Sequence, residues 1–573
     1  AQQRHLYSTE WRVLSSGAVG AEPEVAVAPL LVLGRSRSFD NDPISALADG
    51  LAHTRSHPLI ALHSSTEEVR ALPELEGALA LVQATAATAP PSTLLLITVG
   101  GQLEGSCWPF RLVSTGVWGL ARAARAEARL PMRCIDIEIG CVITQLVGAT
   151  EAVNAAEPEL MLRDGVQHVP RLVSAPSPSS GLPVLDASGL HLVSGGLGGL
   201  GLLAARWLAQ QGADGLALAS RSGTVAASMQ SEWKQLRAST TTALIERCDV
   251  AEEADACRMM AKVQCKLAPL RGVWHAAGVL ADGLLPRLTA EALRHVFGPK
   301  AHGAWALHSA SAAAELRSCA LFSSVAALLG GAGQANYSAA NTCLDVLGAC
   351  RRMQGRVATS VQWGAWAEVG MAARGAASER TAVMEASSGF GRIGVAQGLE
   401  ALREAVQPEG PAVLGVLPVV WSRFLGGGAA VPALLTAFAP ERSRAHATEL
   451  GSAETNALSA SSKDVSLEAV LEMVRRTAGG VVDADAPLME AGIDSLGAVE
   501  LRNQLQQAAG DSMALPSTLV FDYPTGRQLA ALLQGSAADT PTVMIPTSPM
   551  QEATSVVLAA VRALLPLSGS SST

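Results

Sequence analysis

A glycine-rich turn between a predicted strand and a predicted helix constrains this chain more than any other feature. Residues 190–212, LHLVSGGLGGLGLLAARWLAQQG, begin as an apolar strand and continue as a helix. Such a turn brings the backbone close to a ligand at a helix N-terminus, where free N–H groups favour anions. The pattern predicts a Rossmann-like unit that binds the pyrophosphate of a dinucleotide. The residues of this turn are Gly195, Gly196, Gly198, Gly199, Leu200 and Gly201.

The residue after the next strand indicates which dinucleotide is bound. Residues 215–220 are a predicted strand that ends at Ser220, and Arg221 follows twenty residues after Gly201. An NAD site has a carboxylate at this distance, whereas an arginine suits the 2′-phosphate of NADPH. The alternative is a solvated surface arginine. The third and fourth strands of the same sheet predict further cofactor contacts at their ends, at Asp249, Val250, Ala276, Ala277 and Gly278.

Strands and helices alternate in two successive regions, which predicts an α/β fold with two Rossmann-like subdomains. The first, residues 1–178, is truncated, and its first strand continues into GRSRSFD instead of a glycine turn, so we expect no cofactor there. The second, residues 179–428, contains the glycine turn. A linker rich in Ala, Gly and Ser covers residues 429–464, and residues 465–536 have amphipathic helices without strands.

The last segment, residues 537–573, is predicted to be a polar linker followed by a helix. That helix repeats a pattern of the preceding region, because V-L-x-x-V-R occurs at 470–475 and again at 557–562. Amphipathic helices produce such matches by chance. The sequence therefore leaves two interpretations open, an unrelated trailing helix or the start of a second copy of the 465–536 unit.

Charge and composition exclude several classes of function. A net charge of −9 disfavours binding to nucleic acid or to an anionic membrane, and no apolar run reaches the about 18 residues of a membrane span. Nine cysteines are scattered without metal-ligand spacing, which predicts reduced thiols in the cytoplasm and no metal site. The first residues contain neither Met nor a secretory signal, so we expect a piece of a longer polypeptide.

Tyr337 is the only tyrosine between residues 180 and 430, and small residues surround it in GGAGQANYSAAN. Reducing a ketone by hydride leaves an oxyanion, which needs a positioned proton donor. A phenol has a pKa near 10 and can serve if a neighbouring cation lowers that pKa. Ser324 ends a predicted strand thirteen residues earlier, and Lys300 lies at a predicted helix start. On their own, Ser324 and Asn341 are ordinary strand-end and helix residues.

Taken together, the glycine turn, LFSS with Ser324, and YSAAN with Tyr337 and Asn341 resemble the short-chain dehydrogenase/reductase superfamily. More narrowly, they are similar to the ketoreductase domains of modular polyketide synthases. In those domains an asparagine replaces the lysine of Tyr-x-x-x-Lys, and the lysine comes from the preceding helix, which matches Lys300. The family also has a cofactor-free structural subdomain that opens with an LY…W strand, as residues 6–11 do.

The resemblance implies a role for each of these side chains in an NADPH-dependent reduction. Tyr337 donates the proton to the alkoxide, and Ser324 hydrogen-bonds the substrate carbonyl. Lys300 lowers the pKa of the phenol and holds the ribose, while Asn341 orders the proton relay.

Stereochemistry also follows from the family pattern. Members that form the B-type alcohol have L-D-D and P-x-x-x-N motifs and lack the tryptophan that marks the A-type. Here Asp282 is present but Ala281 departs from the first motif, and Asn336 is present without its proline. Leu329 occupies the tryptophan position. The resemblance therefore implies a B-type reductase that forms the (3R)-hydroxyl.

A second resemblance lies in residues 488–505, LMEAGIDSLGAVELRNQL, which are followed by FDYPT. Spacing alone predicts that Ser495 is a helix N-cap. The G-x-D-S-L motif, however, is similar to that of acyl carrier proteins, which are all-α four-helix bundles. The resemblance implies that a phosphopantetheinyl transferase attaches 4′-phosphopantetheine to Ser495, and that this arm presents a β-ketoacyl thioester.

These features favour a polyketide synthase fragment that works beside other domains such as a ketosynthase and an acyltransferase. One alternative is a non-catalytic, reductase-like scaffold in which only the carrier domain is active. Another is a free dehydrogenase acting on small ketones, which the fused carrier domain disfavours.

Overall fold

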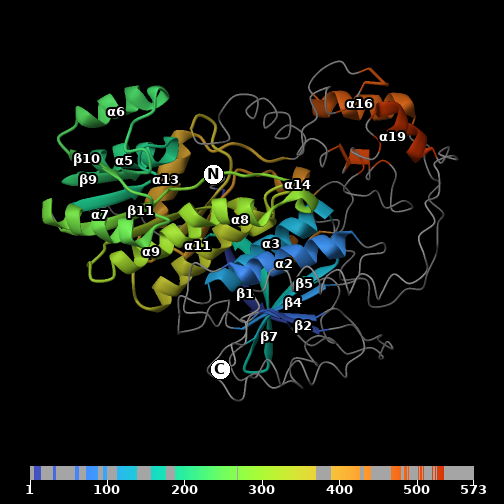
Figure 1. The fold of residues 1–573 in the computed structure, drawn as a ribbon, viewed down its shortest axis with the longest axis horizontal. Helices are drawn as coiled ribbons and strands as arrows, with labels where there is room; N and C mark the ends of the chain where they lie inside the picture. Colours follow the sequence, from blue (N-terminus) through green and yellow to red (C-terminus); the bar gives the residue numbers. More distant parts are fainter. Residues whose placement is uncertain are drawn as a thin grey trace, which may run out of the picture.

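One sheet, with 14 strands among the described residues, runs through both predicted subdomains in this computed structural model (Figure 1). Its strand order is β10-β9-β8-β11-β12-β13-β14-β1-β7-β6-β5-β4-β3-β2. The predicted α/β class is therefore confirmed, and the two subdomains share a single sheet. The structure describes residues 5–14, 30–33, 59–62, 72–87, 94–99, 112–128, 130–137, 157–175, 187–266, 269–369, 389–425, 431–439, 466–478, 483–486, 488, 501–502, 504–505, 508, 519, 523 and 525–534.

The first subdomain has seven described strands, and four of them, β2 to β5, lie in apolar runs of the sequence. They are β1 (Leu6–Val13), β2 (Leu30–Leu33), β3 (Leu59–Leu62), β4 (Leu94–Val99), β5 (Met132–Ile137), β6 (Glu159–Arg163) and β7 (Val166–Ser174). Its described helices are α2 (Pro73–Ala86) and α3 (Leu112–Ala128). From β2 to β6 the strands are parallel and lie in chain order. The described strands therefore lack a reversal of order, which is where open α/β sheets bind their ligands.

The second subdomain has the strand order of a dinucleotide-binding sheet. Its strands are β8 (Leu190–Ser194), β9 (Gly215–Ser220), β10 (Thr242–Arg247), β11 (Leu270–His275), β12 (Ser318–Ser324), β13 (Thr359–Trp363) and β14 (Val413–Val416). The chain moves outward from β8 to β10 and then returns to place β11 on the other side of β8. In open α/β sheets ligands bind in the crevice at such a reversal, which here lies at the carboxyl ends of β8 and β11.

Helices cover this second part of the sheet. They are α5 (Gly199–Gln210), α6 (Gln230–Arg237), α7 (Glu253–Lys266), α8 (Ala290–Phe297), α9 (Gly303–Ala310), α10 (Val325–Leu329), α11 (Ala335–Met353), α13 (Val395–Ala405) and α14 (Trp421–Phe424). A π-helical turn, η4 (Gly298–His302), joins α8 to α9, and the 3₁₀ turns are η2 (Ala227–Met229) and η3 (Leu285–Arg287).

Strand β1 joins the two subdomains. It pairs antiparallel with β14 on one side, where Leu6 faces Val416, and with β7 on the other. The Tyr7 hydroxyl accepts a hydrogen bond from Trp421 Nε1 at 3.1 Å. The sequence assigns this strand to the first subdomain, whereas in the structure it also completes the edge of the second.

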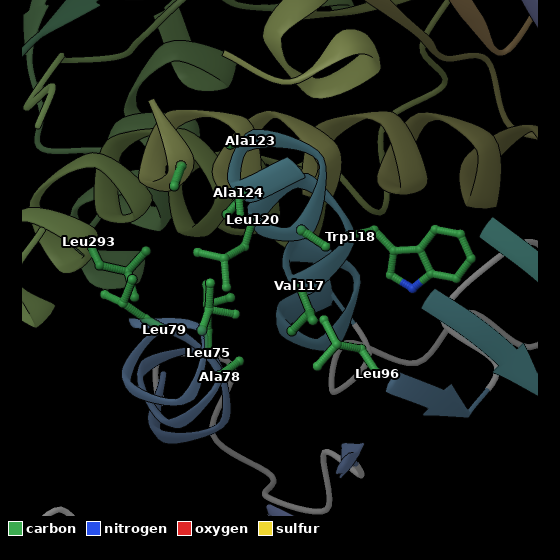
Figure 2. Packing of buried hydrophobic residues seen from close by; sticks show 14 of the residues in the cluster. Leu75, Ala78, Leu79, Leu96, Val117, Trp118, Leu120, Ala123, Ala124 and Leu293 are labelled. Atoms are coloured by element: carbon green, nitrogen blue, oxygen red, sulfur yellow. The ribbon is translucent and has the colours of Figure 1, made fainter. Parts of the chain in front are cut away.

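The interface between the subdomains is a helix pair, α3 of the first subdomain against α11 of the second (Figure 1). Figure 2 shows how α3 fills this region, with Val117 and Leu120 facing Leu75 of α2 and with Trp118 on another side of the helix. Gly119 allows the close approach, because a Cβ there would lie 2.6 Å from the carbonyl carbon of Ser338 on α11. The helix that contains Tyr337 is thus seated on the first subdomain.

The helical region after residue 465 has its own apolar core. Helices α16 (Leu467–Ala478) and α19 (Gly526–Leu533) bury Val470, Val474 and Leu529 together, and Thr525 caps α19. Ser495 and residues 537–573, including the possible second copy, lie outside the described residues. Within the predicted linker, residues 433–438 form a 3₁₀ turn, η5 (Ala433–Phe438), which packs Leu435 against Tyr7.

Neither a membrane-spanning helix nor a metal-binding cluster occurs among the described residues. No helix among them has the length and apolarity that a bilayer crossing requires. They also contain no group of three or more His, Cys, Asp and Glu side chains that could hold a metal ion. Six described cysteines are free thiols, whereas Cys350 is in a disulfide, which differs from the prediction of reduced thiols throughout.

Candidate active site

The glycine turn follows β8 and leads into α5, as the sequence predicts. Gly195 has φ of +68°, and a Cβ there would lie 2.7 Å from the amide nitrogen of Ala277. A Cβ on Gly201 would lie 2.8 Å from the carbonyl carbon of Gly195. Side chains are therefore excluded both inside the turn and at its contact with the loop after β11. The N-terminus of α5 is left open, with Gly198 as its N-cap and with no side-chain cap.

The other predicted cofactor residues follow neighbouring strands at the same edge of the sheet. Arg221 is exposed directly after Ser220, the last residue of β9. Asp249 accepts a hydrogen bond from the Ala251 N–H at 3.1 Å, just beyond β10. Beyond β11, the Ala276 N–H donates to the carbonyl oxygen of Ser194 at 3.0 Å. These positions all follow strands at the edge of the sheet where the strand order reverses, and the uncapped N-terminus of α5 and the exposed Arg221 suit a dinucleotide.

The predicted catalytic residues also meet at this edge. Ser324 ends β12, and Tyr337 lies in the first turn of α11. Lys300 is 4% exposed, and its Nζ lies 5.2 Å from the centre of the Tyr337 ring. The same Nζ donates a hydrogen bond to the carbonyl oxygen of Phe322 at 2.8 Å. A Cβ on Gly278 would lie 3.2 Å from Lys300 Cε, so the lysine also borders the loop of the cofactor crevice.

Burial dominates the protonation of Tyr337 and Lys300. It raises the pKa of Tyr337 to about 12, although hydrogen bonds with the Asn341 and Ser324 side chains oppose that rise. It lowers the pKa of Lys300 to about 7, against the attraction of Asp345. The expected lowering of the phenol pKa by Lys300 is not found: burial raises this pKa, and the opposing effects come from the Asn341 and Ser324 hydrogen bonds. A raised pKa keeps the proton on the phenol, which is the form a proton donor needs.

Asn341 lies one helical turn after Tyr337 and is completely buried. Its Nδ2 donates to the Tyr337 carbonyl oxygen at 2.8 Å, and its backbone oxygen accepts from Ser323 Oγ at 3.2 Å. Its Oδ1 has no hydrogen-bond partner within the described structure. A buried carbonyl oxygen without a partner is a place for a bound water or a ligand donor.

Asp345, one further turn along α11, is a buried residue that the sequence analysis missed. It accepts hydrogen bonds from Ser360 Oγ at 2.6 Å and from Gln362 Nε2 at 2.8 Å. Burial raises its pKa to about 6, and these hydrogen bonds oppose the rise. The sequence did contain a signal for Asp345, because residues 337, 341 and 345 are spaced by four and share one face of a helix.

His275 is a second residue that the sequence analysis missed, although it lies in the quoted VWHAAG strand. It is fully buried, with Nδ1 2.7 Å from Ser194 Oγ and Nε2 2.8 Å from the Lys300 carbonyl oxygen. The carbonyl can only accept, so Nε2 donates to it and Nδ1 accepts from the serine. Burial, with the positive charge of Lys300, lowers the His275 pKa to about 3. This neutral ring fixes the π-helical turn of Lys300.

Two of the three residues of the stereochemical pattern, Asp282 and Asn336, lie beside Tyr337. Asp282 accepts a hydrogen bond from Gln334 Nε2 at 3.1 Å. Asn336 is buried, and its Oδ1 accepts from the Tyr337 N–H while its Nδ2 donates to the Ala281 carbonyl oxygen, both at 2.8 Å. Leu329 ends α10 and packs in the cluster that contains Leu328. Asn336 therefore uses its amide to connect two loops.

Three protein families match successive parts of this chain. The family described as "Polyketide synthase extender module SpnB, Rossmann fold domain" matches residues 9–172, and "KR domain" matches residues 189–368. The family described as "Phosphopantetheine attachment site" matches residues 468–533. These matches agree with the two subdomains and the helical region.

Solved structures support the first two matches. The ketoreductase PlmKR1 from the first module of phoslactomycin biosynthesis in Streptomyces sp. HK803 is 28% identical, with a TM-score of 0.63 over 76% of this chain and 99% of that one. A structure titled "Structure of A-type Ketoreductases from Modular Polyketide Synthase" is 26% identical, with a TM-score of 0.64 over 77% of this chain and 99% of that one.

Curated relatives are much longer than this chain. Polyketide synthase GfsA of Streptomyces halstedii is 36% identical over 74% of this chain and 6% of its own length. Pikromycin polyketide synthase component PikAIII of Streptomyces venezuelae is 32% identical over 92% of this chain and 36% of its own length. The chain thus spans a small part of the relatives it matches. Residues 189–368 therefore belong to the ketoreductase (KR) domain family and residues 468–533 to the phosphopantetheine attachment-site family, the two being joined in one chain that is similar to modular polyketide synthases.

Proposed function

We propose that this chain reduces a β-ketoacyl thioester to the β-hydroxyacyl thioester with NADPH, while the acyl chain is held on the carrier domain. The observation on which the proposal depends is the meeting of Tyr337, Ser324 and Lys300 at the edge of the sheet that also has the glycine turn. A non-catalytic scaffold has no need to bury a lysine beside a phenol, because burying an amine costs free energy.

The residues that would hold NADPH are those of the crevice. The open N-terminus of α5 suits the pyrophosphate. Arg221 would pair with the 2′-phosphate, and this preference over NADH is supported by the exposed arginine directly after β9. Lys300 would hydrogen-bond the ribose. When bound, NADPH supplies the hydride that reduces the ketone.

Proton transfer is the work of the protein side chains. Ser324 orients the ketone oxygen by a hydrogen bond, and Tyr337 gives its proton to that oxygen as negative charge develops there. An alkoxide is more basic than a phenolate, so a phenol with a pKa of about 12 still transfers its proton downhill. Lys300 and the Asn341 Oδ1 then support the return of a proton to the phenol.

The product configuration belongs to the same proposal. We assign the B-type outcome, a (3R)-hydroxyl, because Asp282 and Asn336 are present and Leu329 replaces the tryptophan of the A-type pattern. The hydrogen bonds of Asp282 and Asn336 connect the loops beside Tyr337, so these residues are placed to affect which face of the ketone is presented.

The substrate and partners follow from the carrier domain. Ser495 would bear 4′-phosphopantetheine, added by a phosphopantetheinyl transferase, and the arm would bring the thioester to the crevice at an effective concentration of roughly millimolar. A ketosynthase and an acyltransferase of the same assembly would supply that thioester. We assign the reaction to the cytoplasm.

One experiment tests the function. The purified chain is mixed with NADPH and a simple β-ketoacyl thioester, the loss of NADPH absorbance is followed, and the alcohol is analysed on a chiral column. The proposal predicts turnover to the (3R)-alcohol. A cofactor-binding chain without turnover would instead support the alternative, in which the reductase fold is a scaffold and only the carrier domain is active.

A further inference from the structure

Glu127 of the first subdomain contacts the second subdomain, and both of its carboxylate oxygens accept hydrogen bonds there. It is 1% exposed at the end of α3. Its Oε1 accepts a hydrogen bond from the Leu285 N–H at 2.6 Å, and its Oε2 accepts from the Gly333 N–H at 2.8 Å. These two donors belong to different loops of the second subdomain. One carboxylate therefore holds two loops at once.

The two loops border the catalytic tyrosine. The β11–α8 loop, residues 276–289, contains Asp282, and the α10–α11 loop, residues 330–334, leads directly into the turn of Tyr337. They are also joined to each other, because the Gly283 N–H donates to the Gly333 carbonyl oxygen at 2.8 Å. A displacement at Gly333 is thus transmitted both to Asp282 and to the start of α11.

Gln83, on α2 of the first subdomain, holds the β11–α8 loop from a second position. Its Nε2 donates to the carbonyl oxygens of Leu285 and Leu288, both at 2.8 Å. Glu127 and Gln83 therefore bind the same backbone segment, one as acceptor and one as donor. We call these two residues the loop clamp.

The clamp uses chemistry suited to precise positioning. A buried carboxylate with two backbone N–H donors makes charge-assisted hydrogen bonds, which are shorter and stronger than neutral ones. Because the site is buried, water cannot replace the Glu127 carboxylate as the acceptor for either N–H group. Burial raises the pKa of Glu127, and the two N–H donors oppose that rise.

We propose that Glu127 and Gln83 are positioning residues for the reduction, through which the cofactor-free subdomain sets the stereochemical outcome by fixing both loops beside Tyr337. This inference rests on the proposed reductase function. It gives the first subdomain a part in selectivity, through a contact more than 150 residues away in the sequence from both loops.

The test replaces each clamp residue and compares product ratios. In Glu127→Gln, the amide keeps the shape but directs an NH₂ group at one of the two N–H donors. Gln83→Met removes the donor while it retains similar bulk. For the full chain with a β-ketoacyl thioester, we expect the share of the minor alcohol isomer to rise about tenfold in Glu127→Gln. A tenfold change in this ratio corresponds to about 1.4 kcal/mol in the free-energy difference between the two outcomes. KM should rise more than kcat falls, and the Kd for NADPH should stay within about twofold.

Glu76→Gln is the matched control. Glu76 is on α2 and pairs with Arg294 of α8 at 2.6 Å, so it also links the subdomains, but through a partner on α8 and not through either loop. Its removal should leave the isomer ratio unchanged. A general loss of stability lowers the amount of active enzyme and leaves the ratio of its products the same, so the ratio separates positioning from stability.

Hydrogen exchange gives a readout that needs no turnover. Glu127→Gln should speed exchange of amides in residues 283–288 and 331–336, whereas Glu76→Gln should not. If the unaltered chain shows no turnover, the proposed function fails, and the exchange data still decide whether the clamp exists. The inference is overturned if both clamp variants keep the original isomer ratio, if Glu76→Gln shifts it equally, or if loop exchange is unchanged. Should Glu127→Gln not fold, Gln83→Met alone decides.

Discussion

The Lys300 ammonium nitrogen lies 5.2 Å from the centre of the Tyr337 ring while it donates a hydrogen bond to the Phe322 carbonyl oxygen. The two residues come from different helical segments, and a π-helical turn presents the lysine. Turns of this kind are rare and occur frequently at functional sites. The position of Lys300 is fixed from both ends, by the Phe322 oxygen at its side chain and by His275 at its backbone.

Removal of the phenol hydroxyl should stop the chemistry and spare cofactor binding. We expect Tyr337→Phe to lower kcat by about 10²–10⁴-fold, because the developing alkoxide loses its proton donor. The Kd for NADPH, measured by fluorescence titration, should stay near that of the unaltered chain. Full turnover in this variant would contradict the assignment of Tyr337 as the acid.

Replacing Arg221, the residue after β9, by an acidic residue should change the preference between NADPH and NADH. Arg221→Asp replaces the proposed partner of the 2′-phosphate by a carboxylate that suits ribose hydroxyls. We expect the Kd for NADPH to rise by about tenfold or more, since hydrogen bonds to charged groups contribute about 1.5–3 kcal/mol, and NADH to bind better. Arg237→Asp, at an exposed site on α6, is the control. Equal affinities for both cofactors in the unaltered chain would refute the preference.

Attachment of the arm should depend on one serine. After incubation with coenzyme A and a phosphopantetheinyl transferase, intact-mass spectrometry should show one added phosphopantetheine in the unaltered chain and none in Ser495→Ala. Ser512 also follows an aspartate in the same region, so Ser512→Ala is a fair control and should still gain the arm. An arm retained in Ser495→Ala would place the attachment elsewhere.

The contact between α3 and α11 should tolerate a methyl group at one glycine and reject it at another. Gly119→Ala places Cβ 2.6 Å from the Ser338 carbonyl carbon, and we expect a destabilisation of about 1–3 kcal/mol, seen as a lower Tm. Gly116→Ala, one turn earlier, meets its nearest atoms at 3.4 Å and should be neutral or slightly stabilising. Equal Tm values for the two variants would show that the helices separate more easily than this packing implies.

Acid should weaken the fold through His275. Its pKa is about 3 in the folded chain, against the ordinary histidine value of 6.5 in an unfolded chain, so between these limits the unfolded chain binds the extra proton. The free energy of unfolding should therefore fall as pH decreases from about 6.5, by up to about 1.4 kcal/mol per pH unit from this residue. His275→Gln should flatten the fall in a series of thermal melts from pH 7 to 4. An unchanged slope would exclude His275 as a contributor.

Local patterns predicted much of the fold, whereas the candidate catalytic residues were predicted mainly from the family resemblance. Apolar runs predicted several strands of both subdomains, among them β2 to β5 and β9, and the glycine turn predicted the junction of β8 and α5, because periodicity and backbone space are local properties. The Lys300–Tyr337 pair needed a resemblance to be predicted, since nothing in a single sequence shows which lysine folds back on which phenol. Glu127 and His275 were not found, because their partners are mainly backbone groups, which every residue has. Only the folded chain shows which of these groups meet.

The placement of β1 has a practical consequence for grafting this reductase into other assemblies. A segment excised at residue 179 would carry the whole crevice, yet it would leave β14 with a bare row of amide and carbonyl groups, since β1 normally covers that edge. Open edges of this kind recruit foreign strands and promote aggregation. Recombination boundaries should therefore be set outside both subdomains, so that a transferred segment contains β1 as well as β14.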